Sequence, residues 1–262
     1  MTGKYAIVTG GSTGMGAHFC MECAKRGYHI IIAALAGNEL EETVSKIKNK
    51  FPVEVISFPC DLSKNEEIDR LFNFCNDNNL KVNLLINNVG MGYQGRIDTL
   101  KLEYIDTLLS VNIKAMTRLT MLFRPILEEH APSRIINLSS LASFFPLPYK
   151  SFYAASKAYV RSVSLGLEAE LMSSNISVHV VCPGPVKTNQ TIRSMVAEGG
   201  LIERNAAMEA DDVAQFVFKK IEQGKTVIIP GKINKVLLFL TRVTPKGIRN
   251  SLLRKRFESH KI

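Results

Sequence analysis

The feature that most constrains the fold is a regular alternation of short apolar runs with longer amphipathic runs along most of the chain. The apolar runs are rich in Val, Ile and Leu, as in YAIVT at 5–9, HIIIAA at 29–34 and VNLLIN at 82–87. Strands that are apolar throughout are typical of a parallel sheet that crossover helices cover on both faces. The alternation therefore predicts an α/β domain built on one parallel sheet.

The alternation also predicts the individual elements. We expect strands at 5–9, 29–34, 53–59, 82–87, 134–139, 177–183 and 226–230. We expect helices near 14–26, 38–50, 64–77, 101–126, 152–172 and 210–222. Together they predict a single doubly wound Rossmann-type domain over residues 1–231, with about seven parallel strands and helices on both faces.

Residues 188–209 interrupt the alternation and carry the pair Gly199-Gly200 with loose helical patterning. This segment follows the sixth predicted strand. Loops at the carboxyl ends of parallel strands form the ligand crevice of such sheets. We therefore expect 188–209 to be a substrate lid.

Most of the charge lies at the C-terminal end. From Lys232 onward the chain has nine basic residues and one acidic residue, so this segment holds +8 of the net charge of +9. A basic amphipathic segment at 232–262 either contacts an anionic membrane surface or packs on the lid with its charges solvated. Packing is favoured because Pro245 shortens the amphipathic run. Nucleic acid is not an expected partner, since the basic residues form no known binding module.

Other features bound the compartment and the chemistry. The first strand begins close to Met1, which leaves no room for a signal peptide, and apolar runs such as 236–240 are far shorter than the ~20 residues that span a bilayer. We expect a cytoplasmic protein, peripheral at a membrane only if the basic segment binds there. Five cysteines are an odd number, which favours reduced thiols; Cys20 and Cys23 lack a second pair, so we expect no metal site.

A glycine-rich turn, TGGSTGMG at 9–16, follows the first strand and opens the first helix. Gly10, Gly14 and Gly16 would allow a tight turn and a close approach of the backbone to a pyrophosphate. On its own such a turn is weak evidence, because any tight strand-to-helix turn uses glycine. Its place after the first strand of a βαβ series favours dinucleotide binding.

A second motif lies in SFYAASKAYV at 151–160. Tyr153 and Lys157 are four positions apart, so on a helix they share one face. A neighbouring ammonium favours the phenolate form of a tyrosine, whose pKa is otherwise ~10. A surface pair would show the same spacing. Ser140 lies thirteen residues upstream at the end of the fifth predicted strand, and Asn112 lies in the long helix before it.

These motifs occur in the order seen in the short-chain dehydrogenase/reductase family, which the sequence resembles from Lys4 to about Pro230. The family pattern T-G-x-x-x-G-x-G matches residues 9–16, N-N-A-G matches NNVG at 87–90, and P-G-x-[VI]-x-T matches PGPVKT at 183–188. Val89 replaces the usual alanine. The resemblance implies a nicotinamide dinucleotide cofactor held by Gly10, Ser12, Thr13, Gly14, Met15, Gly16, Leu35, Asp61, Leu62, Asn88, Val89, Gly90, Tyr153, Lys157, Pro183, Gly184, Val186 and Thr188.

The resemblance also implies catalytic roles. Tyr153 is the expected general acid in carbonyl reduction and general base in alcohol oxidation, and Lys157 is expected to lower its pKa and to hold the nicotinamide ribose. Ser140 is expected to polarise the substrate oxygen, with Ser139 as a structural neighbour. Asn112 is expected to hold a water that links Lys157 to solvent.

The cofactor preference depends on the residue that follows the second strand. Leu35 aligns with the position at which members of the family that prefer NAD carry an acidic residue and members that prefer NADP often carry an arginine. Neither signature is present. Without an anion to repel a 2′-phosphate, and with Ser12 and Thr13 able to donate hydrogen bonds to it, NADP(H) is favoured over NAD(H).

The expected substrate is a small apolar ketone or alcohol. Its predicted pocket comprises Met91, Tyr93, Phe144, Phe145, Leu147, Tyr149 and Met195. Such a pocket suits β-ketoacyl, keto-sphingoid or hydroxysteroid molecules, and the sequence does not rank them. For each residue, packing at a subunit interface is an equal alternative. The resemblance implies a homodimer or homotetramer, and the alternative function is a non-catalytic cofactor-sensing or scaffold protein.

Overall fold

The computed structural model describes residues 3–245, 247 and 251. Seven strands form one sheet in the order β3-β2-β1-β4-β5-β6-β9, and all neighbouring strands in it are parallel. They are β1 (Tyr5–Thr9), β2 (His29–Ala34), β3 (Val55–Pro59), β4 (Val82–Asn87), β5 (Ser133–Leu138), β6 (Ile176–Val181) and β9 (Val227–Ile228). The predicted doubly wound Rossmann-type sheet is confirmed.

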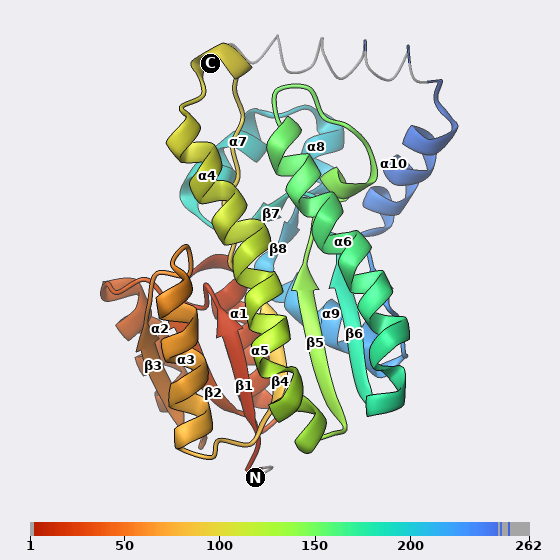
Figure 1. Cartoon of the computed structure of the whole chain (residues 1–262). Helices are drawn as coiled ribbons and strands as arrows, with labels where there is room; N and C mark the ends of the chain where they lie inside the picture. The colour runs from red at the N-terminus through yellow and green to blue at the C-terminus, as the bar shows by residue number, and fades with distance from the viewer. Residues whose placement is uncertain (1–2, 246, 248–250, 252–262) are drawn as a thin grey trace.

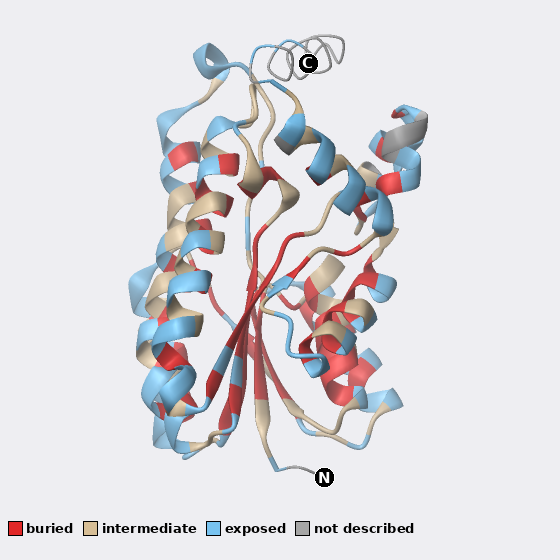
Figure 2. Ribbon diagram, turned by 90° about the vertical axis from the view of Figure 1, so that its right-hand side faces the viewer, coloured by how far each residue is buried: buried red, intermediate tan, exposed pale blue. Residues whose placement is uncertain are grey.

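Helices cover both faces of the sheet, which forms the central layer in Figures 1 and 2. One face is covered by α1 (Gly14–Lys25), α2 (Asn38–Lys50) and α9 (Ala210–Glu222). The other face is covered by α3 (Asn65–Asp77), α5 (Met116–Glu129) and α6 (Ser151–Leu171). Except for α5, the termini of these helices lie within a few residues of the predicted ones.

Strand side chains alternate between the two cores, which explains why the strands are apolar throughout. Ala6 and Val8 of β1 pack in the core beneath α1, whereas Ile7 packs in the core beneath α3 and α5. All three are fully buried. Burial of a large aliphatic side chain contributes about 1.5–3 kcal/mol, so both faces of each strand help to hold the sheet together.

The helix predicted over 101–126 differs from the prediction in two ways. It comprises α4 (Leu102–Leu109), a π-helical segment η2 (Ser110–Ala115) and α5, and it continues through Pro125 to Glu129. A π-helical turn inserts an extra residue into a helix, and such turns are frequent at functional sites. Here the inserted turn contains Asn112, which is buried.

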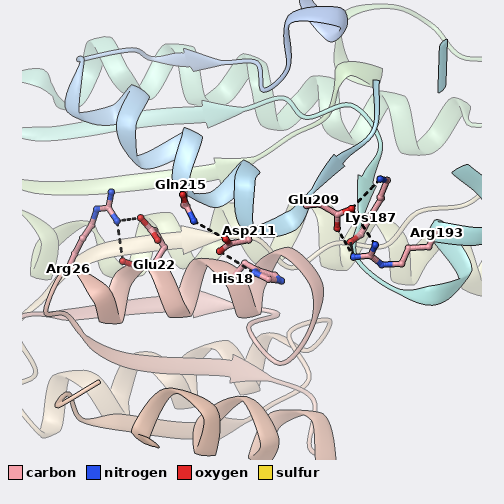
Figure 3. Close-up of polar contacts among 8 residues, drawn as sticks. All are labelled: His18, Glu22, Arg26, Lys187, Arg193, Glu209, Asp211 and Gln215. Atoms are coloured by element: carbon pink, nitrogen blue, oxygen red, sulfur yellow. Dashed lines mark hydrogen bonds and ion pairs between the residues drawn. The ribbon is translucent and has the colours of Figure 1, made fainter. Parts of the chain in front are cut away.

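The segment predicted as a lid consists of α7 (Gln190–Glu198) and α8 (Leu201–Ala206), between the short strands β7 (Val186–Lys187) and β8 (Met208–Glu209). Figure 3 shows the ion pairs at its base. Glu209 accepts from Lys187 Nζ at 3.1 Å and from Arg193 Nη2 at 2.6 Å. One carboxylate thus joins both short strands to α7.

Short 3₁₀ turns η1 (Ile97–Thr99), η3 (Leu141–Phe144) and η4 (Met172–Ser174) complete the loops, and α10 (Lys232–Val243) follows the last strand. Residues 246, 248–250 and 252–262 of the predicted basic segment lie outside the described residues. Within the described part, no helix combines the length and the apolarity needed to cross a membrane. The five cysteines are buried free thiols.

Candidate active site

The order of strands in the sheet reverses beside β1, whose neighbours are β2 and β4. The turn after β1 and the turn after β4 are tied together there. Thr9 Oγ1 accepts from the backbone N–H of Asn88 at 2.9 Å and of Val89 at 3.1 Å. In return, Asn88 Nδ2 donates to the carbonyl oxygens of Thr9 and Gly10 at 2.8 and 3.1 Å. In doubly wound sheets, dinucleotides bind at this reversal.

The glycine turn has the geometry that a pyrophosphate needs. Gly10 and Gly14 have φ values of +62° and +54°, which favour glycine. A Cβ on Gly16 would lie 2.0 Å from the Gly10 carbonyl oxygen, so the turn tolerates no side chain there. Helix α1 starts directly after this turn, and its N-cap residue Thr13 makes no side-chain capping bond. The first amides of α1 are thus left for an anion.

Other predicted cofactor residues surround the same edge of the sheet. Leu35 directly follows β2, and its side chain is 67% exposed. Asp61 follows β3, and hydrogen bonds from the Ser63 hydroxyl and amide lower the pKa of its carboxyl group. Thr188 approaches the glycine turn, because a Cβ on Gly14 would lie 3.1 Å from Thr188 Cβ. The residues present therefore fit a dinucleotide.

The predicted catalytic side chains come together at the start of α6. Tyr153 and Ser140 share a hydrogen bond, and a Cβ on Gly92 would lie 3.8 Å from the Tyr153 ring. Lys157 is buried, and its Nζ donates to the Leu138 carbonyl oxygen at 2.9 Å. A Cβ on Gly90 would lie 3.1 Å from that Nζ. The loop after β4 therefore borders both Tyr153 and Lys157.

Burial dominates the acidity of both groups. It raises the pKa of Tyr153, while the hydrogen bond with Ser140 lowers it. Burial also lowers the pKa of Lys157 from 10.5 to about 8, against the opposing effect of Cys182. Tyr153 is thus a phenol at neutral pH, as a proton donor must be. The expected lowering of the tyrosine pKa by Lys157 stays a prediction, because the effects seen on Tyr153 are those of burial and Ser140.

Asn112 holds the loop after β4 against α6. Its Oδ1 accepts from the Met91 amide at 2.7 Å, and its Nδ2 donates to the Met91 carbonyl at 2.8 Å and to Ser156 Oγ at 3.0 Å. Ser156 in turn donates to the Tyr153 carbonyl oxygen at 2.8 Å. The side chain of Asn112 therefore acts as a connector beside Tyr153 and Lys157. Its expected water contact stays a prediction.

Ser139 lies next to Ser140 but has a different set of contacts. Its hydroxyl donates to the Lys157 carbonyl oxygen at 2.7 Å, and the residue is buried. Ser140 instead caps η3 by accepting from the Ala142 amide at 3.1 Å. Ser139 therefore fastens α6 to the end of β5, whereas Ser140 has the hydroxyl that meets Tyr153.

Three residues of this site were not predicted from the sequence. Thr9 and Ser156 are hydrogen-bonding partners of the motif residues Asn88 and Asn112. Asn234 of α10 is 1% exposed, and it fills the space in which a side chain on Gly184 would lie, since a Cβ there would be 2.4 Å from Asn234 Oδ1. Thr9 belongs to the T-G pair of the glycine motif, which was a usable signal. Asn234 belongs to no motif.

The predicted substrate pocket divides into two cavities. Phe144, Phe145 and Leu147 line one of about 570 Å³, together with Ala154, Ala155 and Ala158. Tyr93 and Tyr149 line another of about 280 Å³.

Tyr153 and Ser140 line neither cavity. Ala155 and Ala158 lie on the side of α6 turned away from Tyr153 and Lys157, because successive helical residues are ~100° apart. Met91 is bonded to Asn112, and Met195 is 56% exposed on α7. Five of the seven predicted pocket residues thus line these two cavities, and a common pocket around Tyr153 stays a prediction.

A sheet of this topology, with a glycine turn at its reversal and a tyrosine, serine and lysine beside it, defines the class of dinucleotide-dependent oxidoreductases. A profile described as "short chain dehydrogenase" matches residues 4–198. The chain belongs to the short-chain dehydrogenase/reductase family.

Relatives and solved structures agree with this assignment. The chain is 33% identical over 190 residues to the very-long-chain 3-oxoacyl-CoA reductase of Rattus norvegicus, a match that covers 71% of this chain and 60% of the rat protein. It is 26% identical over 255 residues to the ketoacyl reductase HetN of Nostoc sp., covering 95% and 88%. A metagenomic short-chain oxidoreductase in complex with NADP has a TM-score of 0.73 at 27% identity, covering 87% and 96%.

Proposed function

We propose that this protein is an NAD(P)(H)-dependent ketoreductase that interconverts a ketone and a secondary alcohol. The observation that carries the proposal is the placement of Tyr153 and buried Lys157 one turn apart on α6, with Ser140 close enough to lower the pKa of Tyr153, next to a glycine turn that suits a dinucleotide. The alternative of a non-catalytic cofactor-binding scaffold would not need a proton donor at this place.

The chain's own residues account for the proton transfer. Ser140 donates a hydrogen bond to the substrate oxygen, and Tyr153 Oη gives its proton to that oxygen as negative charge develops on it. Lys157, whose pKa is lowered to about 8, both holds the cofactor ribose and returns a proton towards Tyr153 near neutral pH. When bound, the nicotinamide cofactor supplies the hydride for reduction or accepts it in oxidation.

The proposed substrate class is a β-ketoacyl thioester. Two relatives, from rat and from Nostoc, are named as reductases of 3-oxoacyl or ketoacyl groups. NADP(H) is the proposed cofactor, because Leu35 places no negative charge beside a 2′-phosphate and a similar structure contains NADP.

The test is a turnover assay of the purified protein with 3-oxoacyl-CoA of several chain lengths, with a keto-sphingoid and a ketosteroid as alternatives, and with NADPH or NADH. We expect NADPH-dependent reduction of the acyl substrates. Tyr153→Phe should abolish turnover and leave the affinity for NADPH, measured by fluorescence, nearly unchanged. Binding of NADPH without reduction of any ketone would favour the scaffold function instead.

Two further expectations from the sequence stay proposals. We propose a homodimer or homotetramer in which the helices near 101–126 (α4 and α5) and 152–172 (α6) form the interface, and a cytoplasmic location. Light scattering coupled to gel filtration tests the first proposal, and a monomeric mass would contradict it. Microscopy of a tagged full-length chain tests the second.

A further inference from the structure

Helix α10 has one face that is fixed to the rest of the protein. On this face Asn234 Nδ2 donates to the carbonyl oxygens of Ala206 and Pro230 at 3.1 and 2.9 Å. Leu238, one turn further along, is 5% exposed. The helix also contacts α8 of the lid and the η3 turn. Asn234 and Leu238 thus attach α10 to the lid and to the edge of the cofactor site.

The opposite face of α10 is apolar and exposed. At ~100° per residue its members fall within one arc of about 120°. Exposure along this arc runs from 39% at Ile233 to 64% at Phe239. The members of this arc, the α10 outer face, are Ile233, Val236, Phe239, Leu240 and Val243. A contiguous group of large apolar side chains on a surface marks an interaction site, whereas single exposed ones do not.

The charges around the α10 outer face are positive. The helix, KINKVLLFLTRV, contains no Asp or Glu. Lys232 is exposed within the same arc, and Lys235 borders it. Lys235 Nζ and Lys220 Nζ of α9 both lie over the Phe216 ring, 5.9 and 5.6 Å from its centroid. An apolar stripe edged by lysines matches a surface that is apolar inside and anionic at its boundary.

A second copy of the chain fits this face less well. In a two-fold interface the same patch meets itself, so the lysines of one copy would meet a patch whose own charges are lysines. Helix α10 offers no acidic partner to them. Lysine is also depleted in the cores of protein interfaces. Charge complementarity therefore favours an anionic lipid surface over a copy of the chain.

We propose that the α10 outer face docks on an anionic phospholipid bilayer, with the helix lying in the plane of the membrane interface. Its apolar side chains enter the acyl boundary, and the nearby lysines are attracted to the negative surface. Because the inner face of α10 holds Ala206 at the end of α8, docking brings the lid next to the bilayer. A lipid substrate would then reach the site without crossing water. Docking does not depend on the proposed activity and is measured separately from it.

The test is cosedimentation of the full-length protein with phosphatidylcholine vesicles, with and without phosphatidylserine. We expect binding that requires phosphatidylserine and weakens with salt. The double variant Val236→Asp/Phe239→Asp should reduce binding at least tenfold. Met172→Asp is the matched control, because Met172 is 73% exposed on η4 and lies outside α10, and it should bind like the unaltered protein.

Two more measurements decide between lipid and a second copy. Lys232→Gln/Lys235→Gln should lose binding to anionic vesicles while Lys232→Arg/Lys235→Arg retains it. Circular dichroism confirms that each variant is folded, and light scattering gives its oligomeric state. Unchanged sedimentation of the Val236→Asp/Phe239→Asp variant overturns the proposal. The proposal is also overturned if the unaltered protein does not bind vesicles and the altered variants lose its oligomeric state.

Discussion

Gly16→Ala should damage both the fold and cofactor binding, because the space for a side chain is filled by backbone. The added Cβ would lie 2.0 Å from the Gly10 carbonyl oxygen and 2.6 Å from Asn88 Nδ2, where ordinary contact begins at 3.4 Å. The turn therefore has to open by more than about 1 Å, which strains the bonds from Asn88 to Thr9 and Gly10.

The size of the effect follows from those contacts. Overpacking costs about 1–3 kcal/mol, and a buried hydrogen bond left unmade costs about as much again. The sum of about 2–6 kcal/mol lowers the melting temperature by roughly 5–20 °C in a chain of this length. Losing about 3 kcal/mol of hydrogen bonding between the turn and the pyrophosphate should weaken NADPH binding on the order of 100-fold.

Thermal unfolding by circular dichroism and titration of NADPH fluorescence measure the two effects. Gly200→Ala is the matched control, since a Cβ there would meet no atom within 4 Å. We expect Gly200→Ala to leave both measurements nearly unchanged. If the Gly16→Ala variant has the melting temperature of the unaltered protein and an affinity for NADPH within about twofold of it, the crowding argument for this turn is wrong.

Three other substitutions test separate parts of the site. Leu35→Arg should raise the selectivity for NADP(H) over NAD(H) about tenfold, measured as a ratio of kcat/KM, by adding a charged partner for the 2′-phosphate; an unchanged ratio would place Leu35 away from that phosphate. Lys157→Met should remove a pH dependence of the free energy of unfolding. Because the pKa of Lys157 is about 8 in the folded protein and 10.5 in the unfolded chain, the unaltered protein without cofactor should gain up to about 3 kcal/mol of stability relative to the variant between pH 8 and 10.5. A difference in urea stability between the two proteins that does not change over this pH range would contradict the prediction. Glu209→Gln should raise KM several-fold with little change in kcat, because Lys187 and Arg193 lose the carboxylate that joins the base of the lid; an unaltered KM would mean that the lid needs no such anchor.

Two of these tests have matched controls elsewhere on the surface. Leu102→Arg adds the same charge at another exposed leucine and should leave the cofactor ratio unchanged. Glu42→Gln removes an exposed ion pair within α2 and should leave KM unchanged, because the Glu42–Lys46 pair joins no separate elements.

The sheet and the placement of Tyr153 and Lys157 on one helix were predictable because their signals are local. Buried parallel strands are apolar along their whole length, and the i, i+4 spacing of Tyr153 and Lys157 places both on one helical face. The π-helical turn at Asn112 was not predictable, since one inserted residue hardly changes the apolar spacing of a long helix. The role of Asn234 depends on contacts with Gly184 and Ala206, which are distant in sequence.

The division of the predicted substrate residues into two cavities has a similar cause. Residues 144–149 lead from the end of η3 to α6, and their composition indicates an apolar environment without showing which cavity their side chains line. That cavity depends on the path of the chain after Ser140, which caps η3, and on the side of α6 against which the loop packs. Tertiary packing decides both, and a sequence pattern records neither.

The reversal of strand order beside β1 has a consequence for how such a protein diversifies. Most of the residues proposed to hold the dinucleotide come from the first half of the chain, whereas η3, α6, the segment predicted as a lid and α10 come from the second half. Changes in the second half can alter the molecule that is accepted while the glycine turn and its partners stay intact. A chain with this strand order can therefore acquire new substrates when its first half is kept and its second half varies.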